Sequence, residues 1–332
     1  MLGRLRMSTD EALQAYNSLA RDIFSKKNRK WTGQDGAFKS STLQEKVKKL
    51  VLKEGLGEFM LDPSDEPNKK GKAFVCAMPA DNVTYTRRFR TYQVRALASA
   101  NCKIWEAARA TTAAPTFFKR IAIGEEGHAK EEFVDGALGC NNPAIEVLEE
   151  ARTVFGDKRA VRCLVSIGTG QPGAIGLSKP DTFQKVLPTS LIQVLKKIAT
   201  NCESTSNELR ARFENIDAFY FRFNVVHGAQ GISLEEWEKM EELTTHTKAY
   251  MKAESQSIDK IVAVLCDRTS IGLTLGSVCK LQCYLRQDIP KTRQAVFQEL
   301  KGKRKLKTKT NEKGTGLCLS QEIRNSLTVC RS

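Results

Sequence analysis

The sequence predicts an α/β layer fold with a mostly parallel sheet. Helical and strand patterns alternate over residues 8–265, and such alternation is typical of α/β proteins. Within residues 131–143, a short apolar run, an acidic residue, a glycine turn and a helix start follow one another. After residue 265 the pattern decays, so we expect one domain over residues 1–265 and a basic, largely disordered tail over residues 266–332.

The first part of the chain contains two predicted helices and two predicted strands. Ser8 and Glu11 have the spacing of a capping box. The helix that follows has an apolar face formed by Leu13, Tyr16, Leu19, Ala20 and Ile23. A second helix after Ser41-Thr42 presents Leu43, Val47, Leu50 and Val51 on one face. Residues 73–77 form an apolar run that indicates a buried strand, and residues 84–92 indicate another.

The rest of the domain continues the alternation. A helix over residues 105–110 ends before Pro115, because the residue before proline avoids the α region. Residues 143–155 are helical and Gly156 follows as the C′ residue. Residues 160–167 and 219–223 indicate strands, residues 171–183 a loop, and residues 185–213 a helix. Residues 234–264 are mostly helical, with a break near 255–257.

Four arginines are interleaved with aromatic residues in and after the second predicted strand: Arg87, Arg88, Arg90 and Arg95 stand among Tyr85, Phe89 and Tyr92. Such a pattern can contact the phosphates of nucleic acids or lipids. More often it forms a solvated strand face. We expect these arginines to face water.

Asp135 stands at the carboxyl end of the short strand Phe133-Val134 and is followed at once by Gly136. Active-site groups in α/β sheets gather at the carboxyl ends of strands, and a carboxylate there can act as a base. Asp-Gly is also a common turn dipeptide. The local pattern by itself favours the turn and leaves the catalytic interpretation open.

Three motifs in register change that balance. They read W-E-A-A-R-A-T-T-A-A-P-T-F-F at 105–118, F-V-D-G-A followed by N-N-P-A at 133–144, and L-V-S-I-G-T-G at 164–170. Together they resemble the patatin-like phospholipase family, and the fungal members most. The resemblance covers roughly residues 1–255. It implies a three-layer α/β sandwich, hydrolysis of lipid acyl esters by a Ser/Asp dyad, and Asp135 as the dyad aspartate.

The serine of that dyad lies in a G-x-S-x-G elbow between a strand and a helix, and this sequence contains no G-x-S-x-G. Residues 1–7 resemble the far end of the helix that follows the elbow. We therefore expect a patatin-like domain truncated before the elbow, without its first strand, oxyanion loop and serine, and inactive alone. Ser166 ends a strand near the same sheet edge, but it lacks the elbow that activates a serine, and we do not expect it to substitute.

Composition constrains the compartment and the cofactors. The 332 residues carry a net charge of +15, of which residues 266–332 supply +9 from 14 Lys and Arg against 5 Asp and Glu. No apolar run approaches the 18 or so residues of a transmembrane helix. The ten cysteines include no C-x-x-C pair and the three histidines, His128, His227 and His246, form no recognised constellation. We expect reduced intracellular thiols, a cytoplasmic location with peripheral membrane contact through the tail, and no metal or cofactor.

Three functions remain in competition. The first is lipid acyl hydrolysis on a phospholipid or other acyl lipid, by family, and we favour it. The second is a non-catalytic patatin-like protein that binds lipid or a partner. The third is a nucleic-acid-binding module, which rests on the charge run 301–309 alone and has no readout fold behind it. That run also fits anionic lipid binding, a nuclear address or a solubilising tail. The missing first strand further predicts an exposed sheet edge and apolar surface.

Overall fold

A computed structural model of the chain describes residues 1–30, 36–62, 71–82, 85–94, 101–115, 117–125, 127–170, 202–225, 232, 235–267 and 272–280. The chain divides into two compact units, Met1–Cys279 and Lys280–Ser332. Everything below concerns the first unit. The predicted loop 171–183, the first part of the helix predicted over 185–213, Arg95, His227 and the charge run 301–309 lie outside the described residues.

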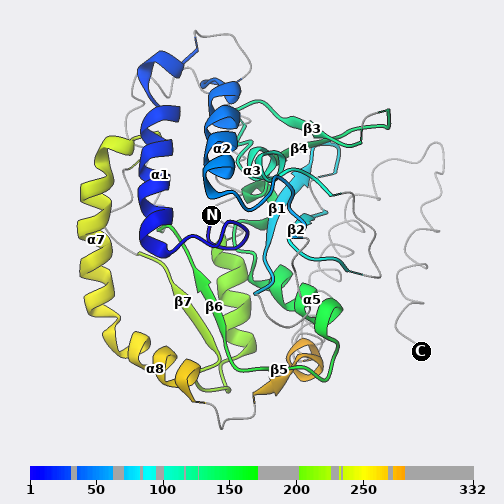
Figure 1. Cartoon of the computed structure of the whole chain (residues 1–332). Helices are drawn as coiled ribbons and strands as arrows, with labels where there is room; N and C mark the ends of the chain where they lie inside the picture. Colours follow the sequence, from blue (N-terminus) through cyan, green and yellow to red (C-terminus); the bar gives the residue numbers. More distant parts are fainter. Residues whose placement is uncertain are drawn as a thin grey trace, which may run out of the picture. The chain divides into compact units, whose positions relative to one another are not determined.

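Two helices, α1 (Thr9–Ile23) and α2 (Ser40–Glu54), lie side by side (Figure 1). The predicted capping box is present: the Ser8 Oγ accepts from the Glu11 N–H at 3.2 Å, and the Ser8 N–H donates to the Glu11 carboxylate at 2.8 Å. α2 buries Leu43, Val47 and Val51 as predicted and ends at Gly55 with φ 65°.

The predicted buried face of α1 is wrong at two positions. Leu13 is 59% exposed and Tyr16 is 49% exposed, whereas Ala12, Ala20 and Ile23 are buried. Leu13 lies one residue, and therefore about 100° of helix rotation, from Ala12. The contact with the core is made by Ala12 together with Leu19 and Ile23 of the predicted face.

A four-stranded sheet packs beside α3 (Ile104–Thr111) and follows the order β2-β1-β4-β3. Its strands are β1 (Phe74–Pro79), β2 (Arg87–Arg90), β3 (Ile121–Ile123) and β4 (Glu131–Asp135). All three pairings are antiparallel, and Ala77 of β1 lies opposite Asp135 of β4. Phe133 and Ala77 are almost fully buried at the centre of the sheet. The Phe89 and Phe133 rings meet edge to face at 5.2 Å.

The mostly parallel sheet predicted from the sequence is not confirmed. Among the described strands, only β6 (Leu164–Ile167) and β7 (Tyr220–Phe223) pair in parallel, while β5 (Ala160–Val161) and β8 (Leu273–Thr274) are antiparallel. Seven residues connect β1 to β2 and seven connect β3 to β4. Parallel strands need a crossover of a dozen or more residues, so these short connections force antiparallel pairing.

The remaining helices follow the predicted order. After the one-turn helix α4 (Ala137–Cys140) come α5 (Ala144–Phe155), a helical stretch over 202–212, α7 (Met240–Ala253) and α8 (Ser255–Cys266). The predicted break within 234–264 is the α7–α8 junction at Glu254. Residues 275–280 are helical and bury Leu275 and Val278 completely. In the part of the chain that the structure describes, no helix is long and apolar enough to cross a membrane.

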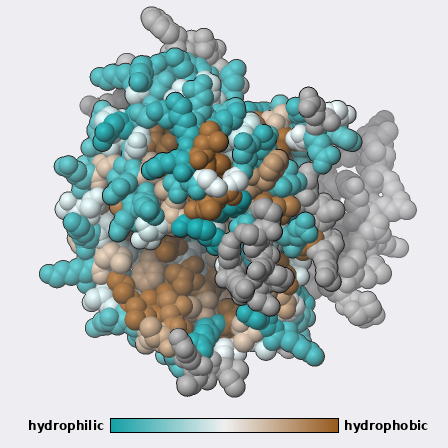
Figure 2. Space-filling view, viewed as in Figure 1, coloured by the Kyte–Doolittle hydropathy of each residue, from teal (hydrophilic) through white to brown (hydrophobic). Residues whose placement is uncertain are grey.

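Among the described residues, one face of the β6–β7 sheet carries apolar side chains that are exposed on β6 and buried at Phe221 of β7. Val165 is 38% exposed and Ile167 is 79% exposed, on alternate positions of β6. Their register partners on β7 are Phe221 and Phe223, which therefore share the same face. Figure 2 shows an apolar patch in the lower part of the view, where Figure 1 places β6 and β7. Parallel sheets are normally covered on both faces, so this face is a surface suited to further contacts.

Candidate active site

Asp135 is the last residue of β4, at the point where the chain turns into α4. Its backbone N–H donates to the Ala113 carbonyl at 3.1 Å, and its carboxylate Oδ1 accepts from the Ala137 N–H at 2.8 Å. The loop after α3 therefore holds the backbone of Asp135, and the first residue of α4 holds its side chain. Among the described residues, no hydrogen-bond donor contacts the second carboxylate oxygen, Oδ2.

Gly136 is required at this turn because β1 passes directly beside it. A Cβ built on Gly136 would lie 2.3 Å from the Cys76 carbonyl oxygen and 2.9 Å from the carbonyl carbon. Real Cβ atoms do not approach backbone atoms so closely. The Asp-Gly pair thus combines the two interpretations made from the sequence: the glycine makes the turn, and the turn presents the carboxylate.

A cavity of about 510 Å³ lies beside the Asp135 side chain. Its walls come from residues 72–76 at and before β1, from Thr111 at the end of α3, and from residues 135–147 after β4. Burial raises the pKa of Asp135 to about 6, and the hydrogen bond from Ala137 opposes this in part. A carboxylate with a pKa near 6 binds and releases a proton close to neutral pH, which suits a general base.

Replacing Asp135 by asparagine is expected to stabilise the fold at neutral pH by about 1–2 kcal/mol, after allowance for solvent around the side chain. The folded-state pKa of about 6 lies above the ordinary value of 3.8. The favourable contribution of the protonated acid is therefore complete below pH 3.8 and is lost as the pH rises through 6. Asparagine never ionises, so the difference should be absent near pH 4, grow between pH 4 and pH 6, and stay constant above pH 6.

Urea unfolding of the Asp135→Asn variant and of the wild type at pH 4, 5, 6 and 7.5 would measure this. Glu132→Gln is the matched control, because Glu132 lies on the same strand with its side chain 52% exposed. A constant difference between Asp135→Asn and the wild type across this range would contradict the argument.

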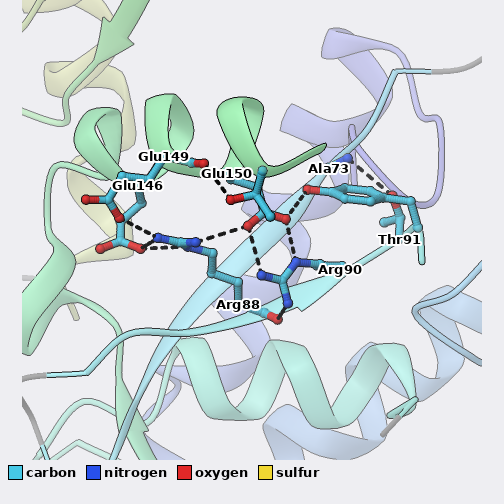
Figure 3. Close-up of polar contacts among 9 residues, drawn as sticks. Ala73, Arg88, Arg90, Thr91, Glu146, Glu149 and Glu150 are labelled. Carbon is cyan, nitrogen blue, oxygen red and sulfur yellow. Dashed lines mark hydrogen bonds and ion pairs between the residues drawn. The ribbon is translucent and has the colours of Figure 1, made fainter. Parts of the chain in front are cut away.

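The sequence pattern indicated that the arginines of β2 face water. Instead, Arg88 and Arg90 bind carboxylates of α5 (Figure 3), and Arg87 binds Glu131 of β4. The Arg90 Nη2 donates to the Glu150 Oε2 at 2.8 Å, and its Nε donates to Oε1. The Tyr92 hydroxyl also donates to the Glu150 Oε1, at 2.8 Å. Arg88 donates to Glu150 at 3.0 Å and to Glu146 at 2.7 Å. We call Arg88, Arg90, Tyr92 and Glu150 the Glu150 cluster.

The Glu150 cluster is a buried structural joint between β2 and α5. The Glu150 side chain is 2% exposed and that of Arg90 is 7% exposed. Burial by itself would raise the pKa of Glu150, but hydrogen bonds from Arg90 and Tyr92 outweigh it and hold the pKa below its ordinary value. Burial and the hydrogen bond with Glu150 raise the pKa of Tyr92. The cluster therefore fixes the middle of α5 against β2.

Ser166 does not occupy a nucleophile's position. Its side chain is buried, and its hydroxyl donates to the Asn142 Oδ1 at 2.9 Å while it accepts from the Arg222 Nη1 at 3.0 Å. These bonds tie β6 to the segment after Asp135, as expected for a structural serine. His128 and His246 are solvent-accessible and each lies near a glutamate of its own turn. Among the residues described, no group of three or more His, Cys, Asp or Glu side chains is placed to hold a metal ion.

Comparison with known proteins now identifies the segment that carries Asp135. Residues 3–148 match the family described as "Patatin-like phospholipase". Over these residues, which make up less than half of the chain, the sequence resembles the patatin-like phospholipase family. The α1–α5 region, with its antiparallel sheet and the Asp135 turn, is therefore a patatin-like segment, and an α/β fold of that kind is consistent with the structure.

Individual relatives extend the similarity beyond that segment. Human "Calcium-independent phospholipase A2-gamma" is 26% identical over 306 residues, which cover 87% of this chain and 37% of the human protein. "Phospholipase A I" of Arabidopsis thaliana is 30% identical over 183 residues, covering 52% of this chain and 12% of the plant protein. "Patatin-like phospholipase 1" of Plasmodium falciparum is 29% identical over 181 residues, covering 47% and 26%. This chain therefore spans little over a third of the length of the human relative.

Proposed function

We propose that Asp135 is the carboxylate of a Ser/Asp dyad that hydrolyses an acyl ester of a phospholipid, a phospholipase A type of reaction. The observation that carries this proposal is the placement of Asp135. It ends a strand of a patatin-like segment, lines a cavity of about 510 Å³, and has a pKa raised to about 6. In such a dyad, the aspartate takes the serine proton directly as the hydroxyl attacks the ester carbonyl.

The serine partner has no counterpart in these 332 residues, since no G-x-S-x-G is present and Ser166 is committed to Asn142 and Arg222. The loss of each oxyanion donor costs about 2.7–4 kcal/mol of transition-state stabilisation. We therefore propose that this chain alone has negligible turnover. The truncation and the fungal kinship stay predictions.

Hydrolysis of a short-chain p-nitrophenyl ester tests the proposal in two stages. The wild-type chain and the Asp135→Ala variant should both remain at the background rate. Activity that is lost in Asp135→Ala would show that a serine of this chain already serves Asp135, and the truncated dyad would be wrong.

In the second stage, a G-x-S-x-G segment from an active family member is joined before Met1. We expect this fusion to hydrolyse the ester, and Asp135→Asn to abolish the activity while the fusion stays folded. Glu132→Gln on the same strand is the matched control and should keep the activity. A fusion whose activity survives Asp135→Asn would exclude Asp135 as the base.

A second candidate is a non-catalytic protein that binds lipid. The observation that favours it is the exposed pair Val165 and Ile167 on the open face of β6. We propose a cytoplasmic protein with peripheral membrane contact, to which the basic residues 280–332 contribute. Sedimentation with vesicles that contain anionic phospholipid, for the chain with and without residues 280–332, measures how much the basic residues and the rest of the chain each contribute to membrane binding. Equal sedimentation with neutral and anionic vesicles would exclude the basic segment as the contact.

A further inference from the structure

Two cysteines, Cys76 and Cys140, line the cavity beside Asp135, and the proposed hydrolysis uses neither. Cys76 belongs to β1 and Cys140 is the last residue of α4. In β1, Ala77 lies opposite Asp135, so Cys76 follows next to Gly136 in the antiparallel register. The Cys76 Cβ would lie 3.4 Å from a Cβ on Gly136. This places the Cys76 side chain beside the first turn of α4.

Cys140 comes four residues after Gly136 and therefore lies on the same face of that turn. The helical hydrogen bond from the Cys140 N–H to the Gly136 carbonyl, at 2.8 Å, fixes this arrangement. Both side chains therefore line the same wall of the cavity, on the two sides of Gly136. Both cysteines are free thiols of intermediate burial, so a small reagent that enters the cavity can reach them.

We propose that Cys76 and Cys140 form an oxidation site, in which a hydroperoxide converts the two thiols into a disulfide that joins β1 to α4 beside Asp135. The proposal concerns a covalent modification and does not depend on the proposed ester hydrolysis. It assigns a role to two cysteines, Cys76 and Cys140, that the acid–base chemistry of Asp135 does not use.

The chemistry balances with hydrogen peroxide as the oxidant. The sulfur of one cysteine attacks the peroxide, the O–O bond breaks, and a sulfenic acid and one water form. The second thiol then attacks the sulfenic sulfur, the S–O bond breaks, the S–S bond forms, and a second water leaves. The hydrogen bond with Cys76, together with burial, raises the pKa of Cys140. Either sulfur can make the first attack, and the other cysteine then attacks the sulfenic sulfur.

The disulfide would fix α4 against β1. The N–H of Ala137 at the start of α4 is the hydrogen-bond donor to Asp135, so the crosslink restrains the group that holds the carboxylate and one wall of its cavity. A crosslink also restricts the unfolded chain, and the oxidised protein should melt at a higher temperature than the reduced protein.

Peptide mapping of the full chain after treatment with hydrogen peroxide, with free thiols blocked, tests the proposal. We expect a linked pair of peptides containing Cys76 and Cys140, the loss of two hydrogen atoms from the intact mass, and a rise in melting temperature that a thiol reductant reverses. Cys76→Ser and Cys140→Ser should each abolish both changes. Cys163→Ser is the matched control, because Cys163 is also a partly buried free thiol but does not line this cavity, and it should leave both changes intact.

The pattern of products decides the outcome. A link between other cysteines, or the accumulation of sulfinic acid on Cys76 without a link to Cys140, would overturn the proposal. If either serine variant fails to fold, mapping of the wild-type protein before and after reduction still gives the decision, since the Cys76–Cys140 peptide pair is then either present or absent.

Discussion

Replacing Glu150 by alanine is expected to lower the free energy of unfolding by about 3–5 kcal/mol, the usual cost of removing one partner of a buried ion pair. The variant leaves Arg90 buried without its carboxylate and Tyr92 without the acceptor of its hydroxyl. Urea unfolding followed by circular dichroism would measure the loss. Because the pKa of Glu150 is lowered in the folded protein, its contribution is present above the ordinary glutamate pKa and is lost as the pH falls through the folded-state value.

Glu149→Ala is the matched control for this prediction. Glu149 is the preceding residue of the same helix and also binds Arg88, at 3.0 Å, but its side chain is 55% exposed. An exposed pair of this kind contributes about 0–1 kcal/mol. If Glu150→Ala cost no more than Glu149→Ala, the Glu150 cluster would not be the joint between β2 and α5 that we describe.

Replacing Gly136 by alanine is expected to destabilise the protein by about 3 kcal/mol, at the upper end of the cost of overpacking. The added methyl group would meet the Cys76 carbonyl at 2.3 Å, and neither β1 nor the turn can move without breaking the sheet pairing at Asp135. Thermal unfolding would detect the loss as a lower melting temperature.

Gly71→Ala is the comparison for Gly136→Ala, because a Cβ at Gly71 meets nothing closer than an Arg6 guanidinium nitrogen at 3.9 Å. The change at Gly71 should stay within about 0.5 kcal/mol of the wild type. Equal melting temperatures for the two variants would show that the turn after Asp135 adapts, and that the glycine is not required by the approach of β1.

Features that depend on neighbours in the sequence were predicted well. The Ser8–Glu11 capping box is confirmed because both partners lie within one helical turn. The C′ glycine Gly156 and the break between α7 and α8 are local in the same sense. The resemblance to the family could also be predicted from the sequence, because the motifs that carry it are short and contiguous. Residues 3–148 match the family model.

Features that depend on distant partners were not predictable from local patterns. Arg88 and Arg90 were expected to be solvated, yet their carboxylate lies about sixty residues away on α5. The alternation of two arginines on one strand face was a signal that an acidic helix face covers it, but the same spacing fits a face in water. Glu150 itself gave no signal, because a glutamate on an otherwise amphipathic helix is common. The role of Asp135 stays a prediction, now with a cavity and a raised pKa beside it.

The position of Glu150 also bears on where this half of the molecule can be divided. The match to the family model ends at residue 148, two residues before the carboxylate that binds both Arg88 and Arg90. A fragment trimmed to the family match would keep Arg90 and discard its carboxylate, while Arg88 would keep Glu146. A protease cut in α5 before Glu150 would have the same effect. A fragment that folds by itself must therefore include the buried carboxylate of Glu150. Its C-terminal boundary lies at or beyond the end of α5, not at the last residue of the family match.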